Sequence, residues 1–563
     1  MESSLWLGSK RHRATLTGWN FKWTRVDRKN RDSKTISVSV SDVVGVEEGR
    51  VSVLPRKTVE DSDKDFTVFY VKRVRSGSSR GLLWRLGQTQ FSCPSRVLRD
   101  QWTKHLRAAL KTHCPLRPNK LLVFINPFGG KKKGKHIYDS LAAPLFALAG
   151  ISCHVIVTER ANQARDHLLK KDLTGYDGVV CVGGDGMFSE VLHGVIGRTQ
   201  QEAGLCENDP SVELQACPLH IGIIPAGSTD CICYATVGVT DPVTSALHII
   251  IGDSQPLDVC SVHHANTLAR YSVSLLGYGF YGDVLLQSEK KRWMGPLRYD
   301  YAGTLVYLSN RSYAGIVHFL PADPLISSPR DKTQCLSGCG VCSSSTERLF
   351  IQSSQSSLCS SHHSHISSEP EGDWVKVEGR FRCVSLTSMS CSCPKSPLGL
   401  SPSAHLADGT GDLILVWDSN PLGFLKYLYR HTSSQDQFDL PFVEVHRVKA
   451  IRFSVSSIEE DGAYKVVREP SPSDEEEKEE NEYHVEELSR NGSLQRLRSK
   501  CSPDSRVTCG MCCGRAPTTS VWNCDGEILP FTDIQCRIHG QLVRLYARGI
   551  EDTAAVQLEN GHL

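Results

Sequence analysis

The stretch Val179–Val191, "VVCVGGDGMFSEV", joins a short apolar run to three glycines that surround one aspartate, and helix-like residues follow. Four apolar residues bounded by turn residues predict a strand that is buried on both faces. Gly183, Gly184 and Gly186 allow a tight turn and a close approach of the backbone to a phosphate, because they carry no Cβ. Taken alone, the stretch fits a simple turn as well as a functional loop.

The same order of strand, glycine loop and helix-length segment recurs along residues 118–270. The apolar runs read "LLVFI", "HVIVT", "VVCV" and "IGII", and the loops after them read "NPFGGKKKGK", "ERANQA", "GGDG" and "PAGSTD". Runs this short and continuous are typical of strands in parallel sheets that helices cover on both faces. The pattern therefore predicts an α/β domain whose ligand loops lie together at the carboxyl ends of its strands.

Residues 271–550 have a different pattern, in which segments of helical periodicity are fewer. Strand-like runs such as "RYSVSLLGYGF", "GIVHFL", "RFRCVSL" and "DLILVW" predict a mainly β domain. Two stretches interrupt it: residues 322–372 are rich in Ser and Cys, and residues 459–520 contain the acidic run "SDEEEKEENE". We expect both to be surface insertions, and the acidic one to stay solvated and disordered.

The first glycine loop comes close to a phosphate-binding P-loop without being one. Gly129, Gly134 and Lys135 fit the pattern G-x-x-x-x-G-K, but His136 stands where that motif needs a Ser or Thr hydroxyl for Mg²⁺. This excludes a P-loop NTPase. A cationic glycine loop that opens a helix can still bind phosphate through its backbone N–H groups.

Residues 1–115 are strongly basic, with 23 Lys/Arg against 11 Asp/Glu in a chain whose formal net charge is +2. Runs of period two predict half-buried strands, and apolar residues at helical spacing after Pro94, Trp102 among them, predict one amphipathic helix. Strands closed by one such helix resemble a pleckstrin-homology domain. The resemblance implies that basic residues near the first hairpin bind phosphoinositide head groups at a membrane surface. These residues are Lys10, Arg11, Arg13, Lys22 and Arg25. A basic β-domain used for protein contacts is the alternative.

Three motifs occur in order, each directly after a predicted strand: "NPFGG" at 126–130, "GGDGMFSEV" at 183–191 and "PAGSTD" at 225–230. Together with "SEKKRWMGPLRYD" and the C-terminal "NCDGEIL", they resemble the diacylglycerol-kinase-type catalytic domain that sphingosine and ceramide kinases share. The resemblance covers roughly residues 118–550. It implies that the α/β domain and a C-terminal β-sandwich enclose ATP between them.

The resemblance also implies roles for individual residues. Asp185 takes the proton from the lipid hydroxyl, or mainly orients that hydroxyl and the metal. Lipid head group and phosphate lie near Gly183, Gly184, Gly186 and Asp283. The residues implied in binding the nucleotide are Asn126, Pro127, Phe128, Thr158, Glu159, Arg160, Ala161, Asn162, Glu190, Gly227, Ser228, Thr229, Arg292, Arg298, Asp525, Gly526 and Glu527. The third loop departs from the family pattern P-x-G-T-x-N-D, because Asp230 follows Thr229 directly and the Asn is absent.

Within that family, the pleckstrin-like N-terminus and the cysteine cluster "CLSGCGVC" favour ceramide as the acceptor and ceramide 1-phosphate as the product. ATP and Mg²⁺ are implied as cofactors, and a dependence on Ca²⁺ stays open. Sphingosine or diacylglycerol is the alternative acceptor. A soluble NAD kinase, which shares the GGDG motif, and a non-catalytic phosphoinositide-binding scaffold are alternatives of other classes.

The 22 cysteines are read as thiols or metal ligands rather than disulfides, because no secretory signal precedes them. Three of them are closely spaced: Cys335, Cys339 and Cys342. They suit zinc with a fourth ligand from His362, His363 or His365, and redox and structural roles are the alternatives.

The cellular location and a further partner are predicted from the absence of a long apolar window and from the segment 422–432. No window approaches the roughly 18 apolar residues of a membrane span. We expect a cytoplasmic protein that binds peripherally to intracellular membranes and the plasma membrane, without a nucleic-acid partner. Residues 422–432 form a short, basic, amphipathic stretch, which fits a core helix of the β domain or a calmodulin-like groove.

Overall fold

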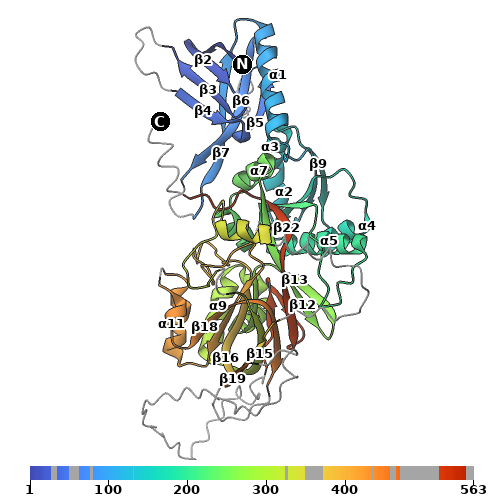
Figure 1. Cartoon of the computed structure of the whole chain (residues 1–563), viewed down its shortest axis with the longest axis vertical. Helices are drawn as coiled ribbons and strands as arrows, with labels where there is room; N and C mark the ends of the chain where they lie inside the picture. Colours follow the sequence, from blue (N-terminus) through green and yellow to red (C-terminus); the bar gives the residue numbers. More distant parts are fainter. Residues whose placement is uncertain are drawn as a thin grey trace, which may run out of the picture.

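The computed structural model describes residues 1–26, 35–49, 63–75, 80–130, 132–323, 327–348, 372–433, 435–456, 465–468 and 519–552. Figure 1 shows an elongated molecule with an antiparallel sheet at one end, helices and parallel strands in the middle, and a β-rich part at the other end. Within the described residues, no helix combines the length and the apolar character needed to cross a bilayer.

The N-terminal domain is a seven-stranded antiparallel sheet closed by one helix, as the sequence predicts. Its strands have the order β4-β3-β2-β1-β7-β6-β5. Their bounds are β1 Glu2–Leu7, β2 Lys10–Leu16, β3 Asn20–Arg25, β4 Thr35–Ser39, β5 Val43–Glu48, β6 Asp65–Val74 and β7 Leu83–Ser92. Helix α1, Arg96–His113, begins at Ser95, whose hydroxyl accepts a hydrogen bond from Leu98 N. Trp102 on α1 is fully buried and stacks on Phe66, so the helix seals the core.

The middle of the molecule is a parallel sheet with helices on both faces. Its strands are β8 Lys120–Ile125, β9 Ser152–Val157, β10 Gly178–Gly183 and β11 His220–Pro225, in the order β11-β10-β8-β9. Its helices are α2 Gly134–Ile137, α3 Ala143–Leu148, α4 Gln163–Lys170, α5 Asp185–Ala203, α6 Cys231–Val237 and α7 Pro242–Ile251. Alternate residues of β8 face opposite cores: Phe124 packs with α4 and α5, and Val123 packs with α3 and α7.

One of the four strands is less buried than its sequence indicates. Strands β8, β10 and β11 are almost wholly buried, but β9 alternates between half-buried and exposed residues, and Val155 and Val157 are exposed. The reason is position, because β9 is the last strand of the sheet and has a strand on one side alone. An apolar run predicts a strand here but not the strand's place in the sheet.

The C-terminal part is β-rich, and its last strand returns to the middle of the molecule. Strand β22, Ile534–Tyr546, pairs antiparallel with β12, Ser254–His264, and with β18, Val443–Val455, and then runs parallel to β11. The other elements are β13 Thr267–Ser272, β14 Leu275–Gly279, α8 Phe280–Glu289, α9 Leu297–Ser309, β15 Tyr313–Pro321, β16 Val375–Thr387, β17 Gly411–Trp417, α11 Pro421–Arg430, β19 Lys465–Arg468, β20 Trp522–Cys524 and β21 Glu527–Leu529. Hydrogen bonds therefore join the two parts into one continuous sheet.

The two predicted insertions are described in part. Residues 327–348 pack against the rest of the chain, and Lys465–Arg468 form a short strand that pairs with β16. The histidine cluster at 362–365 and the acidic run at 473–482 lie outside the described residues.

The N-terminal domain is docked on the α/β domain through a shared apolar core. Trp84 of β7 is fully buried, stacks on His248 of α7 at a ring-centroid distance of 3.8 Å, and donates from Nε1 to Glu551 at 2.7 Å. Arg85 makes two hydrogen bonds to Asp241, the residue that caps α7. This contact fixes the N-terminal domain on the α/β domain.

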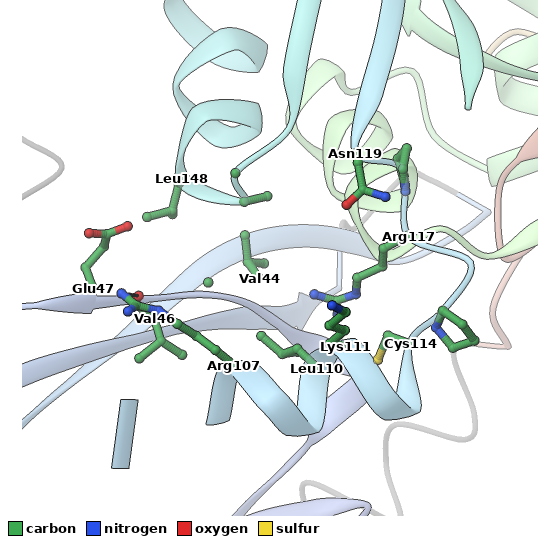
Figure 2. A pocket seen from close by; sticks show the side chains of 15 residues that line it. Val44, Val46, Glu47, Arg107, Leu110, Lys111, Cys114, Arg117, Asn119 and Leu148 are labelled. Carbon is green, nitrogen blue, oxygen red and sulfur yellow. Dashed lines mark hydrogen bonds between the residues drawn. The ribbon is translucent and has the colours of Figure 1, made fainter. Parts of the chain in front are cut away.

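A cavity of about 720 Å³ lies at this junction, between β5, the end of α1 and the end of α3 (Figure 2). Val44, Leu110 and Leu148 supply its apolar side, and Arg107 and Arg117 supply positive charge. No residue of the three glycine loops lines this cavity. This cavity therefore lies apart from the carboxyl ends of the parallel strands.

Candidate active site

The three glycine loops meet at one edge of the parallel sheet. The loop after β8 is held to β10 by a hydrogen bond of 3.0 Å from Asn126 N to Val182 O. The loop after β11 is held to β10 by a hydrogen bond of 3.0 Å from Ala226 N to Gly183 O. Segments that lie about 100 residues apart in sequence are thus neighbours, as expected for carboxyl ends of adjacent parallel strands.

Glycine is required where the loops touch. A Cβ on Gly227 would lie 2.5 Å from Gly184 Cα, and a Cβ on Gly130, which has φ +54°, would lie 2.7 Å from Ala226 O. Both distances are far inside van der Waals contact, so the backbones approach each other as closely as they do because side chains are missing. The glycines therefore shape the site by bringing the loops together.

Asp185 is the first residue of α5 and points its carboxylate at the beginning of α6. Its Oδ2 accepts a hydrogen bond from Cys231 N and its Oδ1 accepts one from Ile232 N, each at 3.1 Å. Burial raises the pKa of Asp185, and these two backbone donors oppose that shift by stabilising the charged form. The arrangement fixes the carboxylate at the point where the second and third loops meet.

Asp230 is a second carboxylate at this point, and the sequence analysis did not assign it a role. Its Oδ1 accepts a hydrogen bond from Gly227 N at 2.9 Å, and its backbone is left-handed with φ +52°. Burial, together with the negative charge of Asp185, raises the pKa of Asp230 to about 7, and the Gly227 N–H opposes the shift. The signal in the sequence was the Asp that ends "PAGSTD". A pair of interacting carboxylates is typical of sites that move protons or bind divalent cations.

We predict that Asp185→Asn lowers the pKa of Asp230, because the negative charge of Asp185 is one of the causes that raise it. Burial of Asp230 is the other cause and stays in place in this variant, so the pKa falls only part of the way toward that of a free carboxyl. The measurement is an NMR titration of the Asp230 carboxyl carbon, and the control is Asp209→Asn, which removes the carboxylate of an exposed turn. A pKa of Asp230 that stays in place or rises in Asp185→Asn contradicts the coupling.

Three residues predicted to bind the nucleotide are Asn126 and Phe128, which follow β8, and Glu190 on α5. Asn126 Oδ1 accepts hydrogen bonds from Phe128 N at 2.9 Å and Gly129 N at 3.0 Å, which folds the first loop. The Phe128 ring is 64% exposed beside that turn. On α5, Glu190 has a buried Oε2 with no hydrogen-bond partner among the described residues. An exposed ring and an unpaired buried carboxylate oxygen suit a bound ligand better than a sealed core.

The turn after β9 is self-contained. The Gln163 side chain accepts hydrogen bonds from Glu159 N and Arg160 N, and Asn162 adopts a left-handed backbone before α4. Thr158 is buried and donates its hydroxyl to Ile125 O at the end of β8. Thr158 thus ties the β9 turn to the start of the first glycine loop.

Comparison with known proteins gives the family. The diacylglycerol kinase catalytic domain matches residues 120–262, the ceramide kinase C-terminal domain matches residues 342–560 and the ceramide kinase PH domain matches residues 1–106. The chain is 45% identical to ceramide kinase of Homo sapiens, over 98% of this chain and 97% of that protein. The chain belongs to the ceramide kinase family. The predicted family and fold class are confirmed.

Two further relatives of the family are ceramide kinase of Mus musculus and ceramide kinase of Arabidopsis thaliana. The first is 44% identical over 98% of both chains, and the second is 32% identical over 69% of this chain and 75% of that one. Among solved structures, a putative diacylglycerol kinase from Bacillus anthracis str. Sterne matches with a TM-score of 0.43 and 13% identity, over 78% of this chain and 98% of that chain.

The two arginines expected at the ATP phosphates, Arg292 and Arg298, both pair with the same glutamate in this structure. Glu289, at the end of α8, forms ion pairs with Arg292 and with Arg298. Arg298 also donates to Tyr299 OH at 2.7 Å. The structure thus brings the two guanidinium groups together at one carboxylate in the β-rich part. Their contact with ATP phosphates stays a prediction.

The C-terminal turn at 525–527 lies beside α5, although many residues separate it from the α/β domain in sequence. Asp525 is half-buried, and its carboxylate accepts from Ser272 Oγ and from the backbone N–H groups of residues 273–275. Glu527 pairs with Arg270, which also donates to Ser189 Oγ on α5 at 3.0 Å. Asp525 therefore holds the chain between β13 and β14 in place, and Glu527 links this turn to the helix of Glu190.

Asp283 is fixed within the β-rich part. Its Oδ2 accepts from Tyr313 OH and its Oδ1 accepts from Ser520 Oγ, each at 2.6 Å, and burial raises its pKa. A second cavity, of about 580 Å³, begins at Asp283 and runs between α8 and α9. Asp283 thus lines a cavity that the sequence did not predict.

Proposed function

We propose that the chain transfers the γ-phosphate of ATP to the primary hydroxyl of ceramide, which gives ceramide 1-phosphate and ADP. The hydroxyl loses its proton to Asp185, its oxygen forms a bond to the γ-phosphorus, and the bond from that phosphorus to ADP breaks. One observation carries the proposal: three glycine loops converge on the half-buried Asp185 in a chain that matches ceramide kinases along nearly its whole length.

ATP fits the edge of the sheet where these loops meet. Phe128 offers an exposed ring for the base, and Asn126 shapes the turn that carries it. Ser228 and Thr229 are exposed beside Gly227, where hydroxyls and backbone N–H groups suit phosphate oxygens. Arg292 and Arg298 bind the phosphates after their ion pairs with Glu289 break. Glu527 keeps its ion pair with Arg270 and so holds the C-terminal turn in place.

Mg²⁺ fits the carboxylates of this site. Asp185 and Asp230, which interact electrostatically, would supply the hard oxygen ligands that Mg²⁺ prefers. The ion supplies charge neutralisation for the phosphates. Ca²⁺ prefers the same ligand type with more of them, so replacing Mg²⁺ by Ca²⁺ in the assay tests the dependence that the sequence left open.

The lipid side of the site is the β-rich part. Exposed apolar residues gather on the turn Arg292–Met294, on α9 and on α11, and a hydrogen bond from Tyr307 OH to Pro421 O links the two helices. They are Trp293, Leu297, Leu305, Leu308, Leu422, Leu425 and Tyr429. An apolar surface of this kind beside the cavity at Asp283 suits acyl chains and a lipid surface. The enzyme then works peripherally at the cytoplasmic face of intracellular and plasma membranes.

The N-terminal domain supplies a basic surface for anionic lipid. Alternation along β2 and β3 puts Arg11, Arg13 and Lys22 on the outer face of the sheet, opposite Ala14 and Trp23 in the core. Lys10 and Arg25 are exposed at the ends of the same strands. Phosphoinositide head groups offer the multiple negative charges that such a face binds.

We predict that Arg11→Ala, Arg13→Ala and Lys22→Ala together weaken binding to vesicles with phosphoinositide by about 100-fold, since each cation contributes about 1 kcal/mol near an anionic surface. The measurement is co-sedimentation at fixed ionic strength. The matched control removes three exposed cations of α1 through Arg96→Ala, Lys104→Ala and Lys111→Ala. Equal losses in the two triple variants would contradict a specific basic face.

Calmodulin is the second partner proposed, through residues 422–432. Phe424 and Tyr427 of α11 are buried in the core, as the core-helix hypothesis predicts. A calmodulin-type groove would therefore take the exposed face with Leu422, Leu425 and Tyr429. Ca²⁺-dependent retention of the full chain on immobilised calmodulin, lost in Leu425→Glu, tests this.

The test of the function is a transfer assay with labelled ATP on ceramide, sphingosine, diacylglycerol and NAD presented in parallel. We expect ceramide to be phosphorylated at least tenfold faster than the other acceptors. Preference for sphingosine or diacylglycerol would change the acceptor and keep the mechanism. Phosphorylation of NAD alone, or of no acceptor, would overturn the proposal.

A further inference from the structure

Three cysteines and one histidine form a cluster that the kinase reaction does not use. Cys335, Cys339, Cys342 and His405 each place one ligand atom within 4.8 Å of all the others. The Sγ atoms of Cys335 and Cys342 are 3.7 Å apart, and Cys339 Sγ lies 3.3 Å from His405 Nδ1. All three cysteines are free thiols.

The separations match a tetrahedral zinc site. With Zn–S distances of about 2.3 Å and Zn–N distances of about 2.0 Å, a tetrahedron places two sulfurs about 3.8 Å apart and a sulfur and a nitrogen about 3.6 Å apart. The observed distances between Cys335 and Cys342, and between Cys339 and His405, are within about 0.3 Å of these values. Cys335 and His405 are buried and Cys339 and Cys342 are half-buried, so the centre of the cluster is shielded from water.

We propose that Cys335, Cys339, Cys342 and His405 bind a structural Zn²⁺ ion. Three thiolates and one imidazole complete a four-coordinate shell and leave no position for water or substrate, which is the pattern of structural rather than catalytic zinc. The shell has one net negative charge. Arg80 of the N-terminal domain lies close enough to Cys335 to interact electrostatically with it, and it donates to Gln334 at 2.9 Å. This guanidinium balances the charge.

The His405 ring is placed for a contact through Nδ1. Its other nitrogen, Nε2, is buried and has no hydrogen-bond partner among the described residues. His362, His363 and His365, which the sequence offered as fourth ligands, lie outside the described residues. The imidazole that the structure sets against a cysteine of the cluster is instead 63 positions beyond Cys342.

The ion cross-links two segments that lie far apart in sequence. The cysteines lie in the segment 327–348, which also bonds from Ser337 N to Ile550 O at 2.9 Å. His405 lies in the loop between β16 and β17. The same loop contains Ser392, whose carbonyl oxygen accepts a hydrogen bond from Cys231 Sγ. The backbone N–H of Cys231 in turn donates to the carboxylate of Asp185. The zinc site thus braces the loop that lies behind Asp185.

The test begins with the metal content of the full-length protein purified without chelator. We expect about one zinc per chain, and less than about 0.2 in Cys339→Ser and in His405→Ala, because three ligands hold structural zinc much more weakly than four. His405→Cys keeps the metal by supplying a thiolate. Cys206→Ser, an exposed cysteine outside the cluster, is the matched control and also keeps it. A variant with His362→Ala, His363→Ala and His365→Ala keeps it as well.

A measurement on the unaltered protein keeps the proposal testable if the variants do not fold. X-ray absorption at the zinc edge is expected to give a first shell of three sulfurs and one nitrogen. Wild-type protein without zinc, whether its cysteines are reduced or paired in a disulfide, would overturn the proposal. So would a shell of other composition, or loss of zinc in the triple histidine variant with retention in His405→Ala.

Discussion

Asp185→Asn is expected to lower kcat for ceramide phosphorylation by about 10²- to 10⁴-fold, the range that a positioned general base contributes. Asn keeps the size of the side chain but cannot accept the proton of the lipid hydroxyl. It retains one acceptor oxygen, so one of the two hydrogen bonds from Cys231 N and Ile232 N survives. The fold should therefore persist with a loss of about 1 kcal/mol in the free energy of unfolding.

The measurement separates the two roles left open for Asp185. If it is the base, kcat falls while KM for ATP and the Mg²⁺ dependence stay close to those of the wild type. If it mainly orients the metal, the Mg²⁺ concentration for half-maximal activity rises and Mn²⁺ restores part of the rate. Asp209→Asn, whose carboxylate also accepts two hydrogen bonds in an exposed turn, should retain full activity. Wild-type turnover by Asp185→Asn would refute both roles.

Gly227→Ala is the second change with a large expected effect, a loss of about 100-fold in kcat/KM. The added Cβ would lie 2.5 Å from Gly184 Cα and 2.6 Å from Asp230 Oδ1. Backbone cannot yield as a flexible side chain does, so the second and third loops must move apart by about 1 Å, a displacement that costs reactions of this kind about two orders of magnitude. The carboxylates of Asp185 and Asp230 would separate with them.

The control for this change is Gly303→Ala on α9, where a Cβ meets no atom within 4 Å. Activity and thermal unfolding should be measured together in both variants. We expect Gly227→Ala to lose activity while most of its thermal stability remains, because the clash is confined to the loops. Equal and small effects of the two substitutions would show that the close approach of the loops is not needed.

The local elements of this protein were predictable because their signals lie in neighbouring residues. The period-two runs of the first domain, the helix around Trp102 and the short apolar strands each appeared where the sequence placed them. The position of Asp185 directly after a buried strand was also predictable from neighbouring residues. Strand propensity, helical spacing and glycine loops act over a few residues, so a single sequence carries them.

Interactions between distant segments were decided by the tertiary structure. Nothing near His405 in sequence points to the three cysteines, and nothing in β22 indicates that it runs parallel to β11. The coupling of Asp230 to Asp185 likewise depends on two loops that meet through missing side chains.

The sequence by itself therefore determined the kinds of elements, the order of the glycine loops and the family. The tertiary structure decided which strand is an edge, which carboxylates face each other and which imidazole faces the thiols. The physical reason is range. Local patterns reflect backbone sterics and burial of neighbouring residues, whereas a site is made when packing brings groups hundreds of residues apart within a few ångströms.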